Sequence, residues 1–376
     1  MVTGATFALW LSLYFYVPFL PLRALDLGAS NTMVGAVIAA YAIAQVGLRI
    51  PIGVGADLLG RRRPFALIAL AASALGALWL AVSPSPWSLF LARALTGVAG
   101  AGWVAVSVLY ASYFSEAETG RAMSRIMAVN AIGLVLATFV GGLLADALDP
   151  LATFYAGVVV GGIGVGMLLL APEPPLERSQ RYSQATFWEV ARTPLLLTVS
   201  AIGIAVQFVS FATSFGFIPV YAERIGASSA AIGNLTTVMF ATSVAGTIGA
   251  PWLARRVGYS AALGIGAAAI ALSVGVVPLL DSVWALGASQ ALGGLGRGGM
   301  NALLITLSVL AVAPAQRATA MGVYQALYAI GMLSGPIVSG IVVDQTSIEA
   351  VFVLSAAVSV LGGAIALTAR MPAAEV

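Results

Sequence analysis

Residues 53–64 read Gly53-Val-Gly-Ala-Asp57-Leu-Leu-Gly60-Arg61-Arg62-Arg63-Pro64. This stretch lies between two long apolar runs and holds the one cluster of charges in the first hundred residues of the sequence. A short loop with three arginines is first of all a marker of membrane topology, because cytoplasmic loops are rich in basic residues. Its aspartate and glycines point to a second role, which depends on the sequence around them.

The composition predicts an integral membrane protein. Hydrophobic residues make up 60% of the chain and charged residues 8%, and the mean hydropathy is +1.02. No soluble domain buries that much apolar surface, so lipid must be the solvent for most of the chain. Met1 is followed almost at once by a span-length segment, and we therefore expect no cleavable signal peptide.

The same composition excludes several classes of site. The chain has no cysteine and no histidine, which removes disulfides, iron–sulfur clusters and the usual metal ligands. All 17 basic residues are arginines, and most lie at membrane boundaries, so the positive charge does not indicate binding of nucleic acid. We expect no metal, no cofactor and no nucleic-acid partner.

Charges, prolines and glycines divide the chain into twelve apolar segments of about 20 residues or more, the length that a bilayer requires. A polar segment at 172–194 follows the sixth of them and predicts a linker between an N-terminal bundle (1–171) and a C-terminal bundle (195–376). Within the linker, Phe187-Trp188-Glu189 predicts a short helix at the membrane surface. The expected spans lie near 4–23, 31–52, 64–83, 87–112, 122–147, 152–171, 195–220, 230–253, 260–280, 283–311, 319–343 and 349–369.

The distribution of arginine predicts the orientation of the chain. With both termini in the cytoplasm, the outer loops hold only Arg23 and Arg224. The inner loops and ends then hold twelve arginines, which is the bias that the positive-inside rule describes. These are Arg61, Arg62, Arg63, Arg121, Arg125, Arg178, Arg181, Arg192, Arg255, Arg256, Arg317 and Arg370.

The two halves form a repeat with an offset of 198 residues. The register holds across all six spans of each half, and an even number of spans gives both repeats the same orientation. The fold class is therefore all-α, with 12 transmembrane helices in two parallel six-helix pseudo-repeats. Matched pairs include Pro21 and Pro219, Gly28 and Gly226, Gly35 and Gly233, Gly60 and Gly258, Gly142 and Gly340, and Asp146 and Asp344.

The whole chain resembles the major facilitator superfamily, and within it the bacterial drug or metabolite exporters. The family's loop signature after the second helix is matched by Gly53, Asp57, Gly60, Arg61 and Arg62. The fourth span carries Arg93-Ala-Leu-Thr-Gly97-Val-Ala-Gly100-Ala-Gly102, which is similar to the family motif with a membrane-embedded arginine. The antiporter motif of the fifth span is altered, because Ala137-Thr138 replaces its Gly-Pro core.

Three arginines lie inside predicted spans, where a charge is costly and commonly functional. Arg49 is near a span end, from which it can reach the interface. Arg93 and Arg297 lie deeper, and no Asp or Glu lies at mid-depth in any predicted span. The embedded charge is therefore positive only, which favours an anionic, zwitterionic or neutral solute over a simple cation.

Polar and amphipathic residues at mid-span complete the predicted substrate site. An amide in hydrocarbon needs a partner or a wet cavity, whereas the aromatic residues have ordinary helix packing as an equal alternative. The Gly293–Gly299 cluster does not match a phosphate loop. We expect the glycine pairs Gly157/Gly161, Gly162/Gly166 and Gly294/Gly298 to let helices approach closely. The predicted substrate-binding residues are Arg93, Arg297, Tyr14, Asn130, Gln207, Asn301, Tyr324 and Gln325.

The resemblance implies a monomeric secondary active transporter that moves a small organic solute by alternating access. Proton-coupled export of a drug or metabolite is the first hypothesis. Organic-anion transport through Arg93 and Arg297 and lipid flipping on the same fold are the alternatives. A membrane-embedded enzyme is not expected, because the residues for such chemistry are missing. We expect a multi-pass protein of the cell inner (plasma) membrane with both termini cytoplasmic, and protons as the coupling ion.

The resemblance also implies that the loop at Gly53 is a gate and not the substrate site. In the family fold Asp57 lies beside the N-terminus of the eleventh helix near Thr319, whose positive end attracts a carboxylate. Arg61 and Arg62 would join nearby acids such as Glu116 or Glu118.

Replacing Asp57 with Asn should lower transport without abolishing substrate binding, because the neutral amide is attracted less strongly to a helix N-terminus. Uptake into vesicles and ligand binding to the purified variant, measured side by side, check this expectation. Normal transport by Asp57→Asn would refute the gate role.

Overall fold

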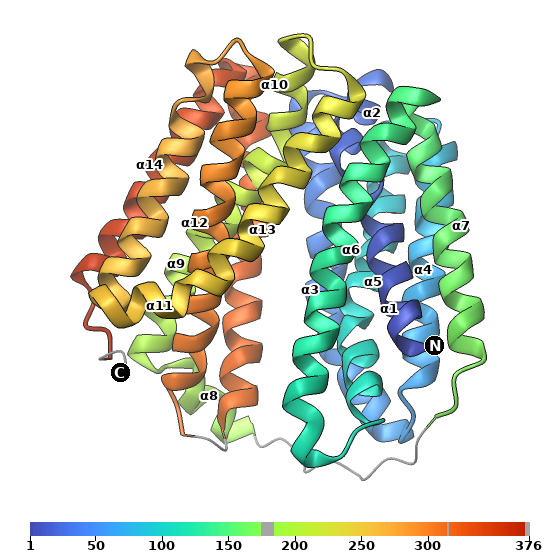
Figure 1. Cartoon of the computed structure of the whole chain (residues 1–376), viewed down its shortest axis with the longest axis vertical. Helices are drawn as coiled ribbons and strands as arrows, with labels where there is room; N and C mark the ends of the chain where they lie inside the picture. The colour runs from blue at the N-terminus through green and yellow to red at the C-terminus, as the bar shows by residue number, and fades with distance from the viewer. Residues whose placement is uncertain (174–183, 314–315, 373–376) are drawn as a thin grey trace. The chain divides into compact units, whose positions relative to one another are not determined.

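The computed structural model describes residues 1–173, 184–313 and 316–372. These residues form helices joined by short connections, and no strand occurs among them. They divide into two compact units, whose helices Figure 1 labels. Unit 1 comprises Met1–Ala29, Ala36–Gln180 and Ala227–Thr237, and unit 2 comprises Ser30–Gly35, Arg181–Gly226 and Val238–Val376. Each unit thus holds a short piece of the other half of the sequence.

Unit 1 is built around α4, which packs against α5 and α7, and around α1, which packs against α6 and α7. Its core consists of small and aliphatic side chains such as Ala66, Leu70 and Leu109, all fully buried. The helices are α1 (Val2–Tyr14), η1 (Val17–Phe19), α2 (Leu20–Asp26), α3 (Asn31–Leu59, whose first turn belongs to unit 2), α4 (Arg63–Val82), α5 (Pro86–Ala111), η2 (Glu116–Glu118), α6 (Thr119–Ala147) and α7 (Pro150–Leu169).

Unit 2 is built around α9, which packs against α12, α13 and α14. The short helix expected at Phe187-Trp188-Glu189 is present as α8 (Gln184–Ala191). The other helices are α9 (Pro194–Ala212), the π-helix η3 (Thr213–Phe217), α10 (Ile218–Arg224), α11 (Ser229–Gly275, whose first turns belong to unit 1), η4 (Val277–Leu279), α12 (Val283–Leu310), α13 (Arg317–Gln345) and α14 (Ile348–Thr368).

The all-α membrane fold is confirmed, and each expected span has a helical counterpart. In the described part of the chain, 10 helical segments are long and apolar enough to cross a membrane. One of them, Ser229–Leu279, has 51 residues and contains two expected spans, 230–253 and 260–280. The expected span at 283–311 is α12, which falls outside those 10 because Arg297, Asn301 and several glycines lower its hydropathy. The domain boundaries predicted from the sequence stay a prediction.

The first span of each half is interrupted, although we expected continuous helices at 4–23 and 195–220. Pro21 lies in the first turn of α2, and its repeat partner Pro219 lies in the first turn of α10. Proline has no N–H to donate to the preceding turn, so each span is broken into pieces there. In unit 2 the break takes the form of the five-residue π-helix η3.

Four of the glycines matched by the repeat share the same backbone conformation. The described residues with positive φ are Gly28, Gly60, Gly226 and Gly258, which are two pairs separated by 198 positions. Only glycine adopts this left-handed region without a steric penalty. At Gly258, φ is 82°, and this residue separates the two spans that α11 contains. The repeat therefore preserves the turns that end helices.

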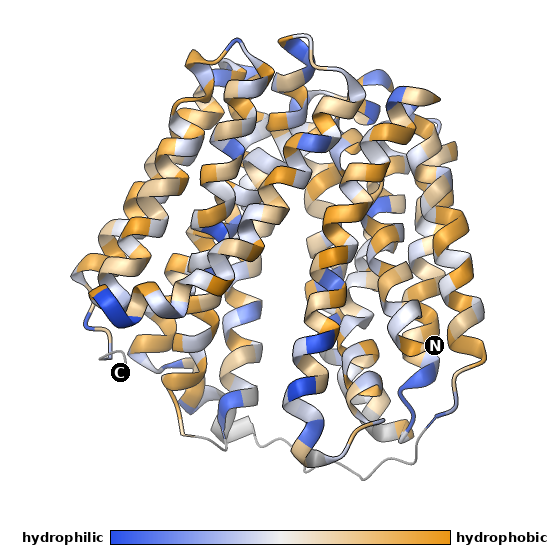
Figure 2. Ribbon diagram, in the orientation of Figure 1, coloured by the Kyte–Doolittle hydropathy of each residue, from blue (hydrophilic) through white to orange (hydrophobic). Residues whose placement is uncertain are grey.

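The surface of the helices is apolar along much of their length. Large hydrophobic side chains such as Ile248, Leu272 and Leu361 are exposed, as suits contact with lipid. Figure 2 shows hydrophobic residues along the helices and the strongest hydrophilic colours mainly toward the connections. The hydropathy pattern agrees with a bilayer around both units.

Replacing Gly298 with Ala should destabilise unit 2, whereas Gly299→Ala should not. A Cβ at Gly298 would overlap the Ser243 carbonyl of α11, but a Cβ at Gly299 would meet its nearest atom, the Gly246 carbonyl oxygen, at 3.6 Å. Overpacking costs about 1–3 kcal/mol, and both variants gain the same helix propensity. Thermal unfolding in detergent measures the difference, and equal melting temperatures would contradict close packing at Gly298.

Candidate functional site

Arg93 lies in α5 of unit 1, buried with 6% of its surface exposed. Its guanidinium carbon is 4.7 Å from the centre of the Tyr41 ring and 6.0 Å from that of the Tyr16 ring. Its Nη1 donates a hydrogen bond to Thr96 Oγ1 at 3.4 Å. Two aromatic faces thus take the position that a carboxylate would have in an ion pair, since a ring face attracts a cation.

The glycines that follow Arg93 bring Tyr41 to it. A Cβ at Gly97 would overlap the Tyr41 carbonyl, and a Cβ at Gly100 would overlap the Tyr41 hydroxyl. Gly97 must therefore lack a side chain for α3 to approach α5 this closely, and a side chain at Gly100 would displace the Tyr41 ring. The Arg93-x-x-x-Gly97-x-x-Gly100 pattern is thereby explained within unit 1: the arginine supplies the charge and the glycines admit the ring beneath it.

Arg297 lies in α12 of unit 2 and is 3% exposed. Its Nη2 donates to Thr213 Oγ1 at 3.2 Å, while its Nε and Nη1 have no hydrogen-bond partner among the described residues. The Thr213 hydroxyl donates in turn to the Val209 carbonyl at 2.7 Å. Arg297 therefore has one neutral contact and two N–H-bearing nitrogens still to be satisfied.

The glycines around Arg297 let α12 pack directly on α11. A Cβ at Gly294 would overlap Thr242 and Met239, and one at Gly293 would overlap Ser273. Gly294 and Gly298 serve helix packing, as we expected, whereas the same expectation is wrong for Gly162 and Gly166, where a Cβ would meet nothing within 4 Å. Close packing on this side of α12 contributes to the burial of Arg297.

A buried polar group extends the Arg297 site along α12 toward η3. Gln290 lies two helical turns before Arg297 and is 1% exposed. Its Oε1 accepts from the Ser214 hydroxyl at 3.4 Å, and its Nε2 donates to Ser289 Oγ at 3.4 Å. Thus α12 bonds two consecutive residues of the π-helix, Thr213 and Ser214. Single π-turns inside helices are frequent at functional sites.

Neither embedded arginine is paired with an acid in the described chain. The ion pairs of Arg61 with Glu173 and of Arg224 with Glu349 both involve exposed arginines. Removing a cation from water costs several kcal/mol unless other groups replace the water. Tyrosine rings do so for Arg93, whereas Arg297 has only the Thr213 hydroxyl.

The remaining predicted substrate residues fall into both units. In unit 1, the Tyr14 ring is 5.9 Å from that of Trp10, which is 5.3 Å from Trp103. In unit 2, the Tyr324 ring is 5.2 Å from that of Tyr328 and is 1% exposed. No hydrogen bond among the described residues joins either arginine to the half-buried amides, which are Asn130 in unit 1 and Gln207, Asn301 and Gln325 in unit 2.

Arg61 of the basic loop has another acid as its partner than the two that were expected. Glu173 Oε1 accepts from the backbone N–H groups of Arg62 and Arg63 at 2.6 and 2.9 Å, and so caps the start of α4. Glu173 Oε2 lies 3.7 Å from Arg61 Nε. Glu118, an expected partner, instead accepts from the Ser115 hydroxyl at 2.7 Å. The side chains of Asp57 and Glu116 lie outside the described residues, so the predicted Asp57 latch stays a prediction.

The Arg63 side chain joins the start of α4 to the end of α7. Its Nε donates to the Leu168 carbonyl at 3.1 Å, and its Nη2 donates to that of Leu169. The loop arginines and the chain after α7 therefore form one cluster at this end of unit 1. Gly53 and Gly60 of the loop signature are half-buried.

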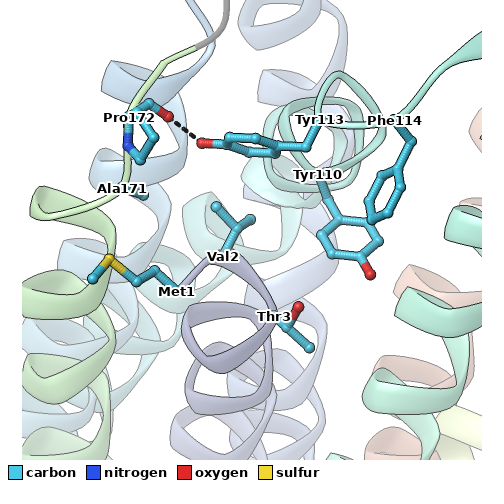
Figure 3. A pocket seen from close by; sticks show the side chains of 8 residues that line it. All are labelled: Met1, Val2, Thr3, Tyr110, Tyr113, Phe114, Ala171 and Pro172. Carbon is cyan, nitrogen blue, oxygen red and sulfur yellow. Dashed lines mark hydrogen bonds between the residues drawn. The ribbon is translucent and has the colours of Figure 1, made fainter.

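A cavity of about 280 Å³ lies beside this cluster (Figure 3). The Tyr113 hydroxyl donates to the Pro172 carbonyl at its rim, and partial burial raises the pKa of that hydroxyl, which keeps it protonated as a donor. The lining is mostly apolar and includes none of the predicted substrate residues. It consists of Met1, Val2, Thr3, Tyr110, Tyr113, Phe114, Ala171 and Pro172.

Several site residues were not predicted from the sequence. Gln290 had a detectable signal, because it is an amide seven positions before Arg297 and so on the same face of an apolar helix. Glu173 had a weaker signal as the first acid after the sixth span. Thr213 and Ser214 had none, because nothing local distinguishes them from other hydroxyl residues in helices.

Comparisons with known proteins agree on one family. The family model of the Major Facilitator Superfamily matches residues 2–226 and 200–375. The inner membrane transport protein YajR of Escherichia coli K12 is 28% identical over 222 residues, which are 57% of this chain and 48% of YajR. The multidrug resistance protein MdtG of Enterobacter lignolyticus is 25% identical over 380 residues, which are 95% of this chain and 87% of MdtG.

A solved structure, that of a mutant of the nucleoside transporter NupG, has the same fold. Its TM-score is 0.80 at 19% identity, with 98% of this chain and 99% of that chain covered. At this identity the likeness concerns the fold alone. Among the first curated relatives, the chain spans about half or less of the relative's length.

Replacing Glu173 with Ala should lower the free energy of unfolding by about 1 kcal/mol, because a helix N-terminus loses its acceptor. Glu173→Gln keeps one acceptor oxygen and should lose less. Arg61→Ala should change stability by a few tenths of a kcal/mol at most, because its ion pair is exposed. Unfolding of the three variants in detergent ranks their losses of stability. An effect of Arg61→Ala as large as that of Glu173→Ala would refute the capping role of Glu173.

Proposed function

Because the chain belongs to the Major Facilitator Superfamily, whose members are transporters and not enzymes, we propose that it exports a small organic solute bearing a hydrogen-bond acceptor or a negative charge. Membrane transport follows from family membership. Export and the class of solute are the proposal, and the multidrug resistance relative, which aligns over most of the chain, supports export.

The observation that carries the solute class is the state of Arg297. Its guanidinium is buried, its Nε and Nη1 have no partner among the described residues, and its one hydrogen bond goes to a neutral hydroxyl. Hydrogen bonds to a charged donor contribute about 1.5–3 kcal/mol each. A solute oxygen that enters this part of unit 2 therefore gains bonds that the protein leaves unmade.

The alternative hypothesis was organic-anion transport through both Arg93 and Arg297. Of these two arginines we keep only Arg297 as a contact of the solute. Arg93 lies over the Tyr41 ring and bonds Thr96, so its charge is already partly balanced inside unit 1. We assign Arg93 the role of fixing α3 against α5, and Arg297 the role of meeting the solute.

The proposal extends to coupling and location. We propose protons as the coupling ion and an inner membrane location with cytoplasmic termini. The family resemblance supports the first, and the excess of arginines in the inner loops supports the second.

The Arg297→Gln variant should lose transport of a carboxylate solute about tenfold or more, because the lost charged bond corresponds to at least that factor. Transport of the neutral amide of the same solute should fall less. A thermal-shift panel of carboxylates, their amides and amines first selects the pair that stabilises the wild-type protein.

Uptake into proteoliposomes, with and without an imposed pH gradient, then measures both solutes. Arg93→Gln serves as the matched control and should affect the two solutes equally. Equal losses for both solutes in Arg297→Gln, or stabilisation by amines alone, would overturn the proposed solute class.

A further inference from the structure

Asp344, at the end of α13, binds the first turn of α3 with both carboxylate oxygens. Its Oδ1 accepts from the Asn31 backbone N–H at 3.0 Å and from Asn31 Nδ2 at 2.9 Å. Its Oδ2 accepts from the Thr32 backbone N–H at 2.8 Å and from Thr32 Oγ1 at 2.7 Å. Both partners belong to unit 2, yet Asn31 and Asp344 are 313 positions apart in the sequence.

This contact completes the N-terminus of α3. The first N–H groups of a helix have no partner inside the helix, and the positive end of its dipole attracts an anion. Ser30 Oγ accepts from the N–H of Met33 at 3.2 Å, and Asp344 supplies acceptors for Asn31 and Thr32. A local serine thus covers one N–H group, while the two before it depend on a carboxylate from another helix.

The other half of the sequence repeats the contact in a weaker form inside unit 1. Asp146, the repeat partner of Asp344, accepts from the Ala230 N–H of α11 at 3.3 Å. Ser228 Oγ accepts from Ala231 N–H at 3.3 Å, as Ser30 does for Met33. Ala230 stands where the first half has Thr32 and has no hydroxyl to donate, which removes one bond of the stronger cap.

Each cap lies at a place where two helix backbones touch. A Cβ at Gly340 would overlap the Asn31 carbonyl, and one at Gly35 would overlap that of Pro336. At the second contact, Gly142 and Gly233 face each other with a Cβ on either within 3.0 Å of the other's Cα. The glycine pairs matched by the internal repeat are therefore the residues that allow both contacts.

We infer that Asp344 is a gating residue that holds one state of the transport cycle, with Asp146 as its weaker counterpart. In alternating access, one repeat rocks against the other about a fixed site. A contact between α3 of the first half and α13 of the second must then form in one state and break in the other. Asp344 acts at the start of α3, the end opposite to Asp57, so it is distinct from the loop signature. The inference requires transport but not any particular solute.

Asp344→Asn removes the charge and an acceptor oxygen while it preserves side-chain size. The chain has no cysteine, so spin labels on Leu27→Cys and Gln345→Cys report the distance between these two ends without background. Loss of a charged hydrogen bond should shift the ratio of short-distance to long-distance populations by about tenfold toward the long. Asp281→Asn, at an exposed position between η4 and α12, is the control and should leave the distances unchanged.

Two further variants distinguish gating from a role in folding. Thr32→Val keeps the charge and the fold but removes one of the four bonds, and it should give a smaller shift in the same direction. Asp146→Asn should shift the populations less than Asp344→Asn, because its carboxylate accepts one backbone bond. Unfolding temperatures measured beside the distances identify variants that are merely unstable.

The inference is overturned if folded Asp344→Asn and Thr32→Val keep the parental distances, or if Asp146→Asn has the larger effect. If Asp344→Asn does not fold, Thr32→Val decides the outcome. A failure to transport the solutes proposed above leaves these distances unaffected, so the two proposals fail separately.

Discussion

Backbone-to-backbone approach at glycine is the constraint on which the functional geometry depends. Between helices in lipid there is little hydrophobic driving force, so association relies on close packing of small residues. In unit 1, Gly97 and Gly100 admit Tyr41 beneath Arg93. In unit 2, Gly294 and Gly298 seat α12 on α11 around Arg297. The packing around each of these two arginines therefore depends on nearby glycines, which have no side chain.

The two embedded arginines show how differently a buried cation can be accommodated. Arg93 has aromatic faces and a hydroxyl around it within unit 1, although its buried Nε lacks a hydrogen-bond partner among the described residues. Arg297 has one hydroxyl, and two of its nitrogens lack partners among the described residues. A transporter that must release its solute needs a site that is incomplete without it, since a site fully satisfied by protein gains nothing from binding. We propose Arg297 for substrate contact and Arg93 for structure, because Arg297 has two buried nitrogens without a partner among the described residues and Arg93 has one.

Carboxylates in this chain act mainly at helix ends. Glu173 caps α4, and Asp344 caps α3 from a distant part of the sequence. From the sequence we expected the acids outside mid-span positions, and the family resemblance implied that Arg61 and Arg62 join nearby acids such as Glu116 or Glu118. In the structure Arg61 forms an ion pair with Glu173, because the chain after α7 returns to the start of α4.

The sequence alone determined that lipid surrounds the chain, the number and order of the spans, and the internal repeat. Hydropathy can be read from each segment, and the 198-residue register from a comparison of the two halves of the sequence. The sequence also located Arg93 and Arg297 within spans. Only the tertiary structure decided the partners: Tyr41 for Arg93, Thr213 for Arg297, and Asn31 with Thr32 for Asp344. The physical reason is that hydropathy and spacing report which face of a helix avoids water. Which atoms meet across two helices depends instead on packing between segments far apart in the sequence.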